Sequence, residues 1–239
     1  MNITDVQKSS LTSIGNRFET IFNYQNELAL KYHRIENSKG LLQTQDYPVD
    51  LHDSKGQARI KDFAWRITEE LAEVMDAMEN ETGDNHLHVQ EELADSFHFL
   101  VEMALISGIN CNDIAKAAEE ESKKYLPKTS HCFLESPDLW ETLWIFHSLV
   151  PKTRGFVSTK NGKILKFIKQ LGMVCHTLKN KPWKQSQVLT DESEYRKRFF
   201  KVFLVFIDIC IVFGLSSQDM FDLYFKKAQV NAFRQRSMY

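Results

Sequence analysis

Long segments of this chain carry apolar residues at helical spacing, and few helix breakers interrupt them. Only nine glycines and five prolines occur in 239 residues. Runs in which valine or threonine alternates with polar residues, as in strands, are also few. In residues 14–36 the apolar side chains recur with the helical period, at positions 14, 18, 22, 28, 32 and 35. This pattern predicts an all-α protein built as a helical bundle.

The same pattern places the helices along the chain. We expect them at about residues 14–36, 58–80, 88–107, 112–125, 137–149, 161–180, 192–213 and 217–235. Residues 37–56 contain turn formers and are predicted to be a long loop, and such loops are often functional.

The chain also shows a weak internal repeat. The segment ISGINCNDIAKAA, residues 106–118, aligns with VFGLSSQDMFDLY, residues 212–224. In that register Arg198 falls opposite Glu92, and Lys201 falls opposite Asp95. We therefore predict two related halves within one compact domain. Residues 1–127 would carry an acidic site, and residues 128–239 would be a degenerate copy with a phosphate-binding C-terminus.

Composition narrows the classes of function. A net charge of −2 argues against a general nucleic-acid binder. Residues 199–215 are very apolar but shorter than the roughly 20 residues of a membrane span, so we interpret them as the central helix of a soluble bundle. The four cysteines lack CxxC spacing, and the N-terminus lacks a signal-peptide core. We expect a cytoplasmic protein that binds neither membrane nor nucleic acid.

Two pairs of acidic residues stand out on consecutive predicted helices. Glu70 and Glu73, then Glu92 and Asp95, are each three residues apart and therefore share a helix face. One such pair is usually just solvated. Two pairs flanked by apolar residues would bring four carboxylates to one edge of the core if the helices pack antiparallel. Hard cations such as Mg²⁺ favour oxygen ligands, so a divalent-metal site is the sharper interpretation beside two solvated faces.

The C-terminal segment carries a second candidate site. Lys227, Asn231 and Arg234 form one helical stripe, with Tyr239 just beyond it. Arginine can bind a phosphate through two hydrogen bonds, and lysine adds a point charge. The alternative is a solvated basic helix end favoured by the helix dipole.

Together these pieces resemble a known family. An ExxE motif, 18 intervening residues, an ExxD motif and a terminal K-x3-N-x2-R-x4-Y motif are similar to the all-α NTP pyrophosphatases. The likeness is greatest to the dimeric dUTPases and the phage dCTP/dUTP pyrophosphatases. KPWK at 181–184 resembles a piece of the phage enzymes. QNEL at 25–28 resembles the segment with which the family helps hold the base.

The resemblance implies the fold, the chemistry and the site residues. The fold would be a helical bundle of the all-α NTP pyrophosphatase type. In the presence of Mg²⁺, water would attack the α-phosphorus of dUTP or dCTP and release a monophosphate and pyrophosphate. The resemblance also implies a homodimer. The roles it implies are metal binding by Glu70, Glu73, Glu92 and Asp95, water orientation by Glu73, phosphate binding by Lys227, Asn231, Arg234 and Tyr239, a sugar or water contact by Asp76, and base contact by Gln25.

Three positions depart from the family pattern. Ala29 stands where the family has asparagine after Q-x-x-L, Ala228 replaces asparagine after the C-terminal lysine, and Met238 replaces glycine before the last tyrosine. An alternative hypothesis is therefore a catalytically degenerate member of the same fold that binds a nucleotide or a protein. A purely structural helical adaptor would leave the acidic pairs unexplained.

Two aromatic residues complete the predictions. His98 is expected to be a hydrogen-bonded residue at the edge of the site rather than a ligand. Trp183 follows Pro182 in a predicted loop and is the better candidate for stacking on a base.

Overall fold

A computed structural model describes residues 16–41, 46–79, 85–122, 138–149, 159–181 and 183–236. Within these ranges the chain forms helices and no strand, which confirms the predicted all-α class. Their bounds are α2 Arg17–Ser38, α3 Ser54–Glu79, α4 Asn85–Ile106, α5 Cys111–Ser122, α6 Leu139–Leu149, α7 Lys160–Thr177, α8 Glu192–Val212 and α9 Ser217–Arg236.

Two helix ends differ from the predictions for local reasons. Helix α3 begins at Ser54, four residues before the predicted start, because Asp53 accepts hydrogen bonds from the backbone N–H groups of Lys55 and Gly56, both at 2.9 Å. Helix α7 ends at Thr177 rather than 180. Beyond it the Asn180 side chain bonds to loop backbone, including a 2.8 Å bond from Val188 N–H.

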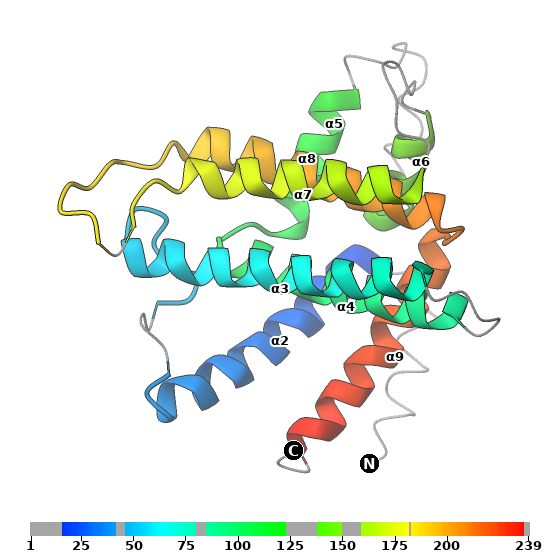
Figure 1. The fold of residues 1–239 in the computed structure, drawn as a ribbon, viewed down its shortest axis with the longest axis horizontal. Coiled ribbons are helices and arrows are strands. Elements are labelled where there is room, and N and C mark those ends of the chain that lie inside the picture. Colours follow the sequence, from blue (N-terminus) through cyan, green and yellow to red (C-terminus); the bar gives the residue numbers. More distant parts are fainter. Residues whose placement is uncertain are drawn as a thin grey trace.

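The helices form two packed pairs and two crossing helices. Helices α3 and α4 lie side by side, and α7 lies against α8 (Figure 1). The α7–α8 pair packs on the α3–α4 pair mainly through α3 and α7. Helices α2 and α9 cross below and contact α4. One face of the α3–α4 pair therefore meets the second pair, and α2 and α9 lie along another.

One continuous hydrophobic core joins all the described helices. Phe97 of α4 lies at its centre, with its ring centroid 5.3 Å from that of Trp140, 5.5 Å from Phe206 and 5.8 Å from Tyr224. These partners come from α6, α8 and α9, beyond the proposed boundary at residue 127. The core thus spans both proposed halves, while their origin as a repeat stays a prediction.

The aligned segments 106–118 and 212–224 form turns of the same kind. Gly108 and Gly214 have positive φ angles of 68° and 79°, which favour glycine. In both turns the residue after the glycine donates its N–H to the carbonyl four residues before the glycine, at 2.9 Å. Two residues after each glycine, another N–H donates to Asp113 or Asp219, at 3.0 and 2.8 Å. The α4–α5 and α8–α9 connections therefore share one hydrogen-bonding scheme.

Among the described residues, no single helix is long and apolar enough to cross a membrane. Only α8 and α9 taken together, across a bend of 101°, meet that length and composition.

Candidate active site

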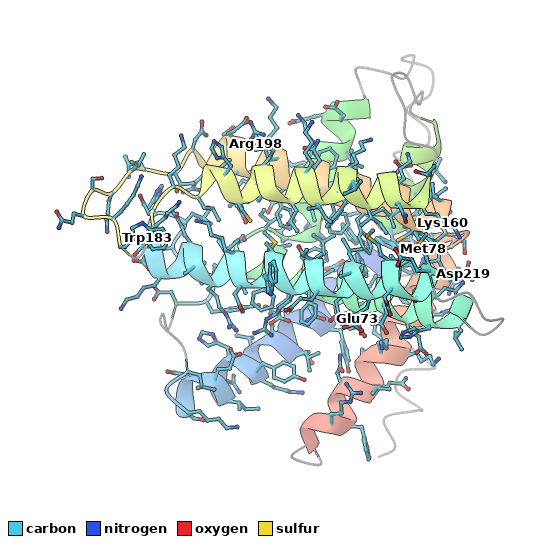
Figure 2. All side chains as sticks on the ribbon, viewed as in Figure 1. Glu73, Met78, Lys160, Trp183, Arg198 and Asp219 are labelled. Atoms are coloured by element: carbon cyan, nitrogen blue, oxygen red, sulfur yellow. The ribbon has the colours of Figure 1, made fainter. Side chains whose placement is uncertain are left out.

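Three of the four predicted acidic ligands converge between α3 and α4. Glu70, Glu73 and Glu92 each offer a carboxylate oxygen, and these oxygens lie within 4.8 Å of one another. Glu92 is buried, Glu70 is partly buried and Glu73 is exposed. Figure 2 shows Glu73 at the edge of α3 that lies away from α7. The two helices thus bring three of the four predicted acids together, and their role as metal ligands stays a prediction.

A nearby positive charge would stabilise the ionised carboxylates of this cluster. Burial raises the pKa of Glu70 to about 8, and a hydrogen bond with Glu92 and the negative charges of its acidic neighbours act in the same direction. Without a cation, Glu70 therefore holds a proton near neutral pH. Three carboxylates with oxygen donors at this spacing fit a hard divalent cation, because such cations favour oxygen ligands.

Asp95 has a different environment from the other three acids. It forms an ion pair with Lys227 of α9, with Nζ and Oδ2 2.6 Å apart. Burial raises the pKa of Asp95, and Lys227 opposes that shift. Asp95 already has a cationic partner and lies outside the three-residue group. Its role as a metal ligand therefore stays a prediction.

A pocket of about 330 Å³ opens beside these acids. Its walls come from α2, α3, α4 and α9. They combine two of the acids with two members of the C-terminal stripe and with Gln25. The lining residues are Gln25, Leu28, Tyr32, Glu36, Arg59, Phe63, Arg66, Glu70, Asp95, His98, Phe99, Glu102, Asn231 and Arg234.

The predicted phosphate-binding stripe lies on this pocket in part. Asn231 and Arg234 line it directly, and Lys227 reaches Asp95 at its edge. Tyr239 lies outside the described residues. Asp76 is exposed on α3 and is not among the lining residues. The structure therefore brings two stripe residues together with two of the predicted acids, Glu70 and Asp95, in one pocket.

Buried polar groups surround Gln25 at the bottom of the pocket. Its side chain is 1% exposed. Nε2 donates to a carboxylate oxygen of Glu102 at 3.0 Å. Oε1 accepts from the Tyr224 hydroxyl at 2.8 Å and lies 2.9 Å from Nδ1 of His98. The other His98 nitrogen, Nε2, lies 3.1 Å from the Tyr224 carbonyl oxygen. The prediction that His98 is hydrogen-bonded is confirmed, and Gln25 occupies a fixed position.

Ala29, one of the three departures from the family pattern, does not line this pocket but a smaller cavity. It is buried and lines a void of about 10 Å³, beside Arg59 and Glu102. That volume holds about one water molecule. Glu102 therefore lies between the void and the larger pocket, and both contact it.

Sequence reasoning missed one wall of the pocket. Arg59, Phe63 and Arg66 of α3 continue the face of Glu70 at spacings of four and three residues. The Arg66 guanidinium carbon lies 5.2 Å from the Phe63 ring centroid and 5.8 Å from that of Phe99. Tracing the acidic face back along the helix would have found this wall.

Trp183, predicted to stack on a base, does not line the pocket. Its side chain is 76% exposed, and the Lys181 ammonium lies 5.2 Å from its ring centroid. Figure 2 shows Trp183 near the left end of the molecule, well away from Glu73.

Comparison with known proteins gives one match. The model of the dUTPase family matches residues 17–239, which include all the residues that line the pocket. No curated protein and no solved structure matches the chain significantly.

Proposed function

The chain belongs to the dUTPase family, and from this premise we propose that it hydrolyses dUTP, with dCTP as the second candidate, to the monophosphate and pyrophosphate. The family is one of dUTP diphosphatases, so a nucleotide is the expected substrate class. The preferred base and the use of Mg²⁺ belong to the proposal.

The observation that carries the proposal is the content of one pocket. Along α4, Asp95, His98 and Glu102 line the same pocket, and the seven residue steps from Asp95 to Glu102 span roughly 10 Å of helix axis. Acids and stripe residues occupy one end, and the buried Gln25 amide belongs to the other. A triphosphate would lie at the first end and a base at the second.

We propose that Glu70, Glu73 and Glu92, joined by Asp95, hold Mg²⁺. When bound, the metal would neutralise the phosphate charge and acidify a bound water. Glu73 is the exposed member of the cluster and would orient the attacking water as a general base.

The remaining roles concern binding. Arg234 and Asn231 would donate hydrogen bonds to phosphate oxygens from the pocket wall. Lys227 would share its charge between Asp95 and the phosphates. Asp76 and Tyr239 keep their predicted contacts to sugar or water and to phosphate. We also propose that the protein is a homodimer, which light scattering on the purified chain would test.

The direct test is product analysis. The protein is incubated with Mg²⁺ and each of the four dNTPs, and the monophosphate and pyrophosphate are quantified. We expect turnover with dUTP or dCTP and its loss in Glu73→Gln. The matched control is Glu69→Gln, which removes the same charge one turn away while keeping an acceptor for the 2.7 Å bond from Trp65 Nε1. If no dNTP is hydrolysed but one binds, the chain is a binding protein and the proposal is wrong.

A further inference from the structure

We propose that a proton on Glu102 fixes the orientation of the Gln25 amide, which makes Glu102 a positioning residue for discrimination between pyrimidine bases. This inference rests on the proposed function for its effect on substrates. The proton arrangement itself follows from the hydrogen-bond geometry of four buried side chains.

The argument begins at His98, whose ring lies between two fixed partners. Nε2 faces the Tyr224 carbonyl oxygen at 3.1 Å, and a carbonyl can only accept. Nε2 must therefore carry a proton. His98 is 4% exposed, and burial lowers its pKa to about 4, so the ring is neutral at physiological pH. A neutral ring has one proton, and Nδ1 is consequently an acceptor.

This result determines the neighbouring amide. An acceptor at Nδ1 requires a donor opposite it, 2.9 Å away, where the structure has the amide oxygen of Gln25. Only the NH₂ group of an amide donates, and hydrogen bonding decides which end of an amide faces which partner. The neutral ring therefore requires the Gln25 amide to be turned over, so that its NH₂ group faces His98 and the Tyr224 hydroxyl, which in the structure donates to the amide oxygen at 2.8 Å. That hydroxyl in turn donates to the Ile21 carbonyl, at 3.3 Å.

In the turned amide the oxygen of Gln25 faces Glu102, where the structure has Nε2 donating to a Glu102 carboxylate oxygen at 3.0 Å. Two acceptors at that distance repel each other unless one holds a proton. A protonated Glu102 donates to the amide oxygen and completes the network with every partner satisfied. An ionised Glu102 instead accepts from the NH₂ group, as in the structure, and this sets the amide oxygen against Nδ1 of His98.

Charged groups around Glu102 place it between these two states. Burial raises its pKa to about 7, and Arg59 and Arg66 on α3 oppose the shift, as does the hydrogen bond from Gln25 in the placement that the structure has. The negative charge of Glu36 on α2 also raises the pKa of Glu102. The charge of Glu102 in turn contributes to the raised pKa of the Tyr47 and Tyr224 hydroxyl groups. On the side of the small void, His33 and Asp46 also line the space next to Glu102. Phosphates bound in the pocket would favour the protonated state.

The orientation matters because uracil and cytosine differ by donor and acceptor. The exocyclic group at position 4 accepts in a thymine-type base such as uracil and donates in cytosine. Turning the Gln25 amide exchanges its donor and acceptor at the base end of the pocket. The ratio of kcat/KM for dUTP and dCTP should therefore depend on the proton of Glu102.

The kinetic test measures that ratio from about pH 5.5 to 8.5, a range that brackets the Glu102 pKa of about 7. We expect the ratio to change at least about fivefold, the effect of one ordinary hydrogen bond. Glu102→Gln is neutral at all these pH values and should make the ratio independent of pH. Glu69→Gln, outside the pocket, should keep the dependence of the wild type. A ratio that is flat in the wild type, or varies equally in Glu102→Gln, overturns the proposal.

The second measurement needs no substrate. Nitrogen-15 shifts of the His98 ring distinguish a proton on Nε2 from one on Nδ1. We expect Nε2–H in the wild type at pH 6, a change at Nδ1 with the same midpoint as the kinetic ratio, and no change in Glu102→Gln. A proton on Nδ1 alone at pH 6 overturns the proposal. If the chain hydrolyses no dNTP, the proposed function fails, and these shifts still decide the proton arrangement.

Discussion

The helix pairs α3–α4 and α7–α8 pack against one another but use charge in opposite ways. In α3–α4, within the described part of the chain, no lysine or arginine forms an ion pair with Glu70, Glu73 or Glu92. In α7–α8, Asp208 is buried and pairs directly with Lys163 of the neighbouring helix. The first pair leaves three clustered acids without a lysine or arginine partner among the described residues, and the second neutralises the charge inside it.

The aligned positions strengthen this contrast. In the register proposed for the repeat, Arg198 and Lys201 fall opposite Glu92 and Asp95, and Arg198 pairs with Glu194 at 2.7 Å. The α7–α8 pair thus packs without acids at these two positions. We propose that the acids of α3–α4 serve a ligand rather than the packing of the helices.

The largest expected effect is on turnover. Glu70→Gln should lower kcat/KM at least about 100-fold, because a metal ligand contributes several kcal/mol to the transition state. The matched change on the other pair is Gln170→Ala on α7, and it should stay within about twofold of the wild type. Steady-state kinetics with dUTP and Mg²⁺ measure both. Equal losses of kcat/KM in the two variants would show that the two helix pairs do not differ in their role in turnover.

The next effect is on stability. Asp208→Asn should lower the free energy of unfolding by about 3 kcal/mol, because it leaves the partly buried Lys163 charge without its carboxylate partner. Replacing both residues together, as Lys163→Met with Asp208→Leu, should recover most of that loss. Urea denaturation followed by circular dichroism measures these changes. A charge pair that can be broken at no cost would contradict a structural role.

A smaller effect tests the likeness of the two turns. Gly108→Ala and Gly214→Ala should each cost about 1–2 kcal/mol, the penalty of a left-handed conformation for a residue with Cβ. An added Cβ at Gly214 meets nothing within 4 Å, and one at Gly108 meets only ordinary contacts. The two costs should therefore agree. Clearly different costs in thermal unfolding would show that the turns are not equivalent.

The smallest effect is the pH dependence of stability without metal. Since the folded pKa of Glu70 is raised to about 8, the folded state binds the extra proton, and stability falls as pH rises from about 4.5 to 8. Glu70→Gln removes this loss and should unfold about 2–4 °C higher than the wild type above pH 8, the shift expected for about 1 kcal/mol. Calorimetry in a chelator measures it. Added Mg²⁺ should raise only the wild type appreciably.

The positions of the helices could be predicted because each helix is ended by residues close to it in the sequence. Glycines such as Gly108 and Gly214 end helices through their own backbone conformation, which the sequence displays directly. The acidic cluster was predictable for a similar reason, since two three-residue spacings on neighbouring helices need only antiparallel packing.

The rest of the site depends on contacts between distant residues. Lys227 and Asp95 are 132 positions apart (227 − 95), and Gln25 and Glu102 are separated by 77. Arg59 and Arg66 have the spacing of an ordinary solvated face, and only the packing of α2 and α9 turns that face into a pocket wall. Trp183 was assigned to the site from its neighbours in sequence, but its loop lies at the other end of α3.

The twin glycine turns have a consequence for evolution. Each turn sets the exit of its helix through backbone hydrogen bonds and one aspartate, so the course of the chain at these two points does not depend on the clustered acids. If the two halves arose by duplication, one copy could lose its acids one substitution at a time, with each intermediate still folded. The other copy then remained the only one under selection for chemistry.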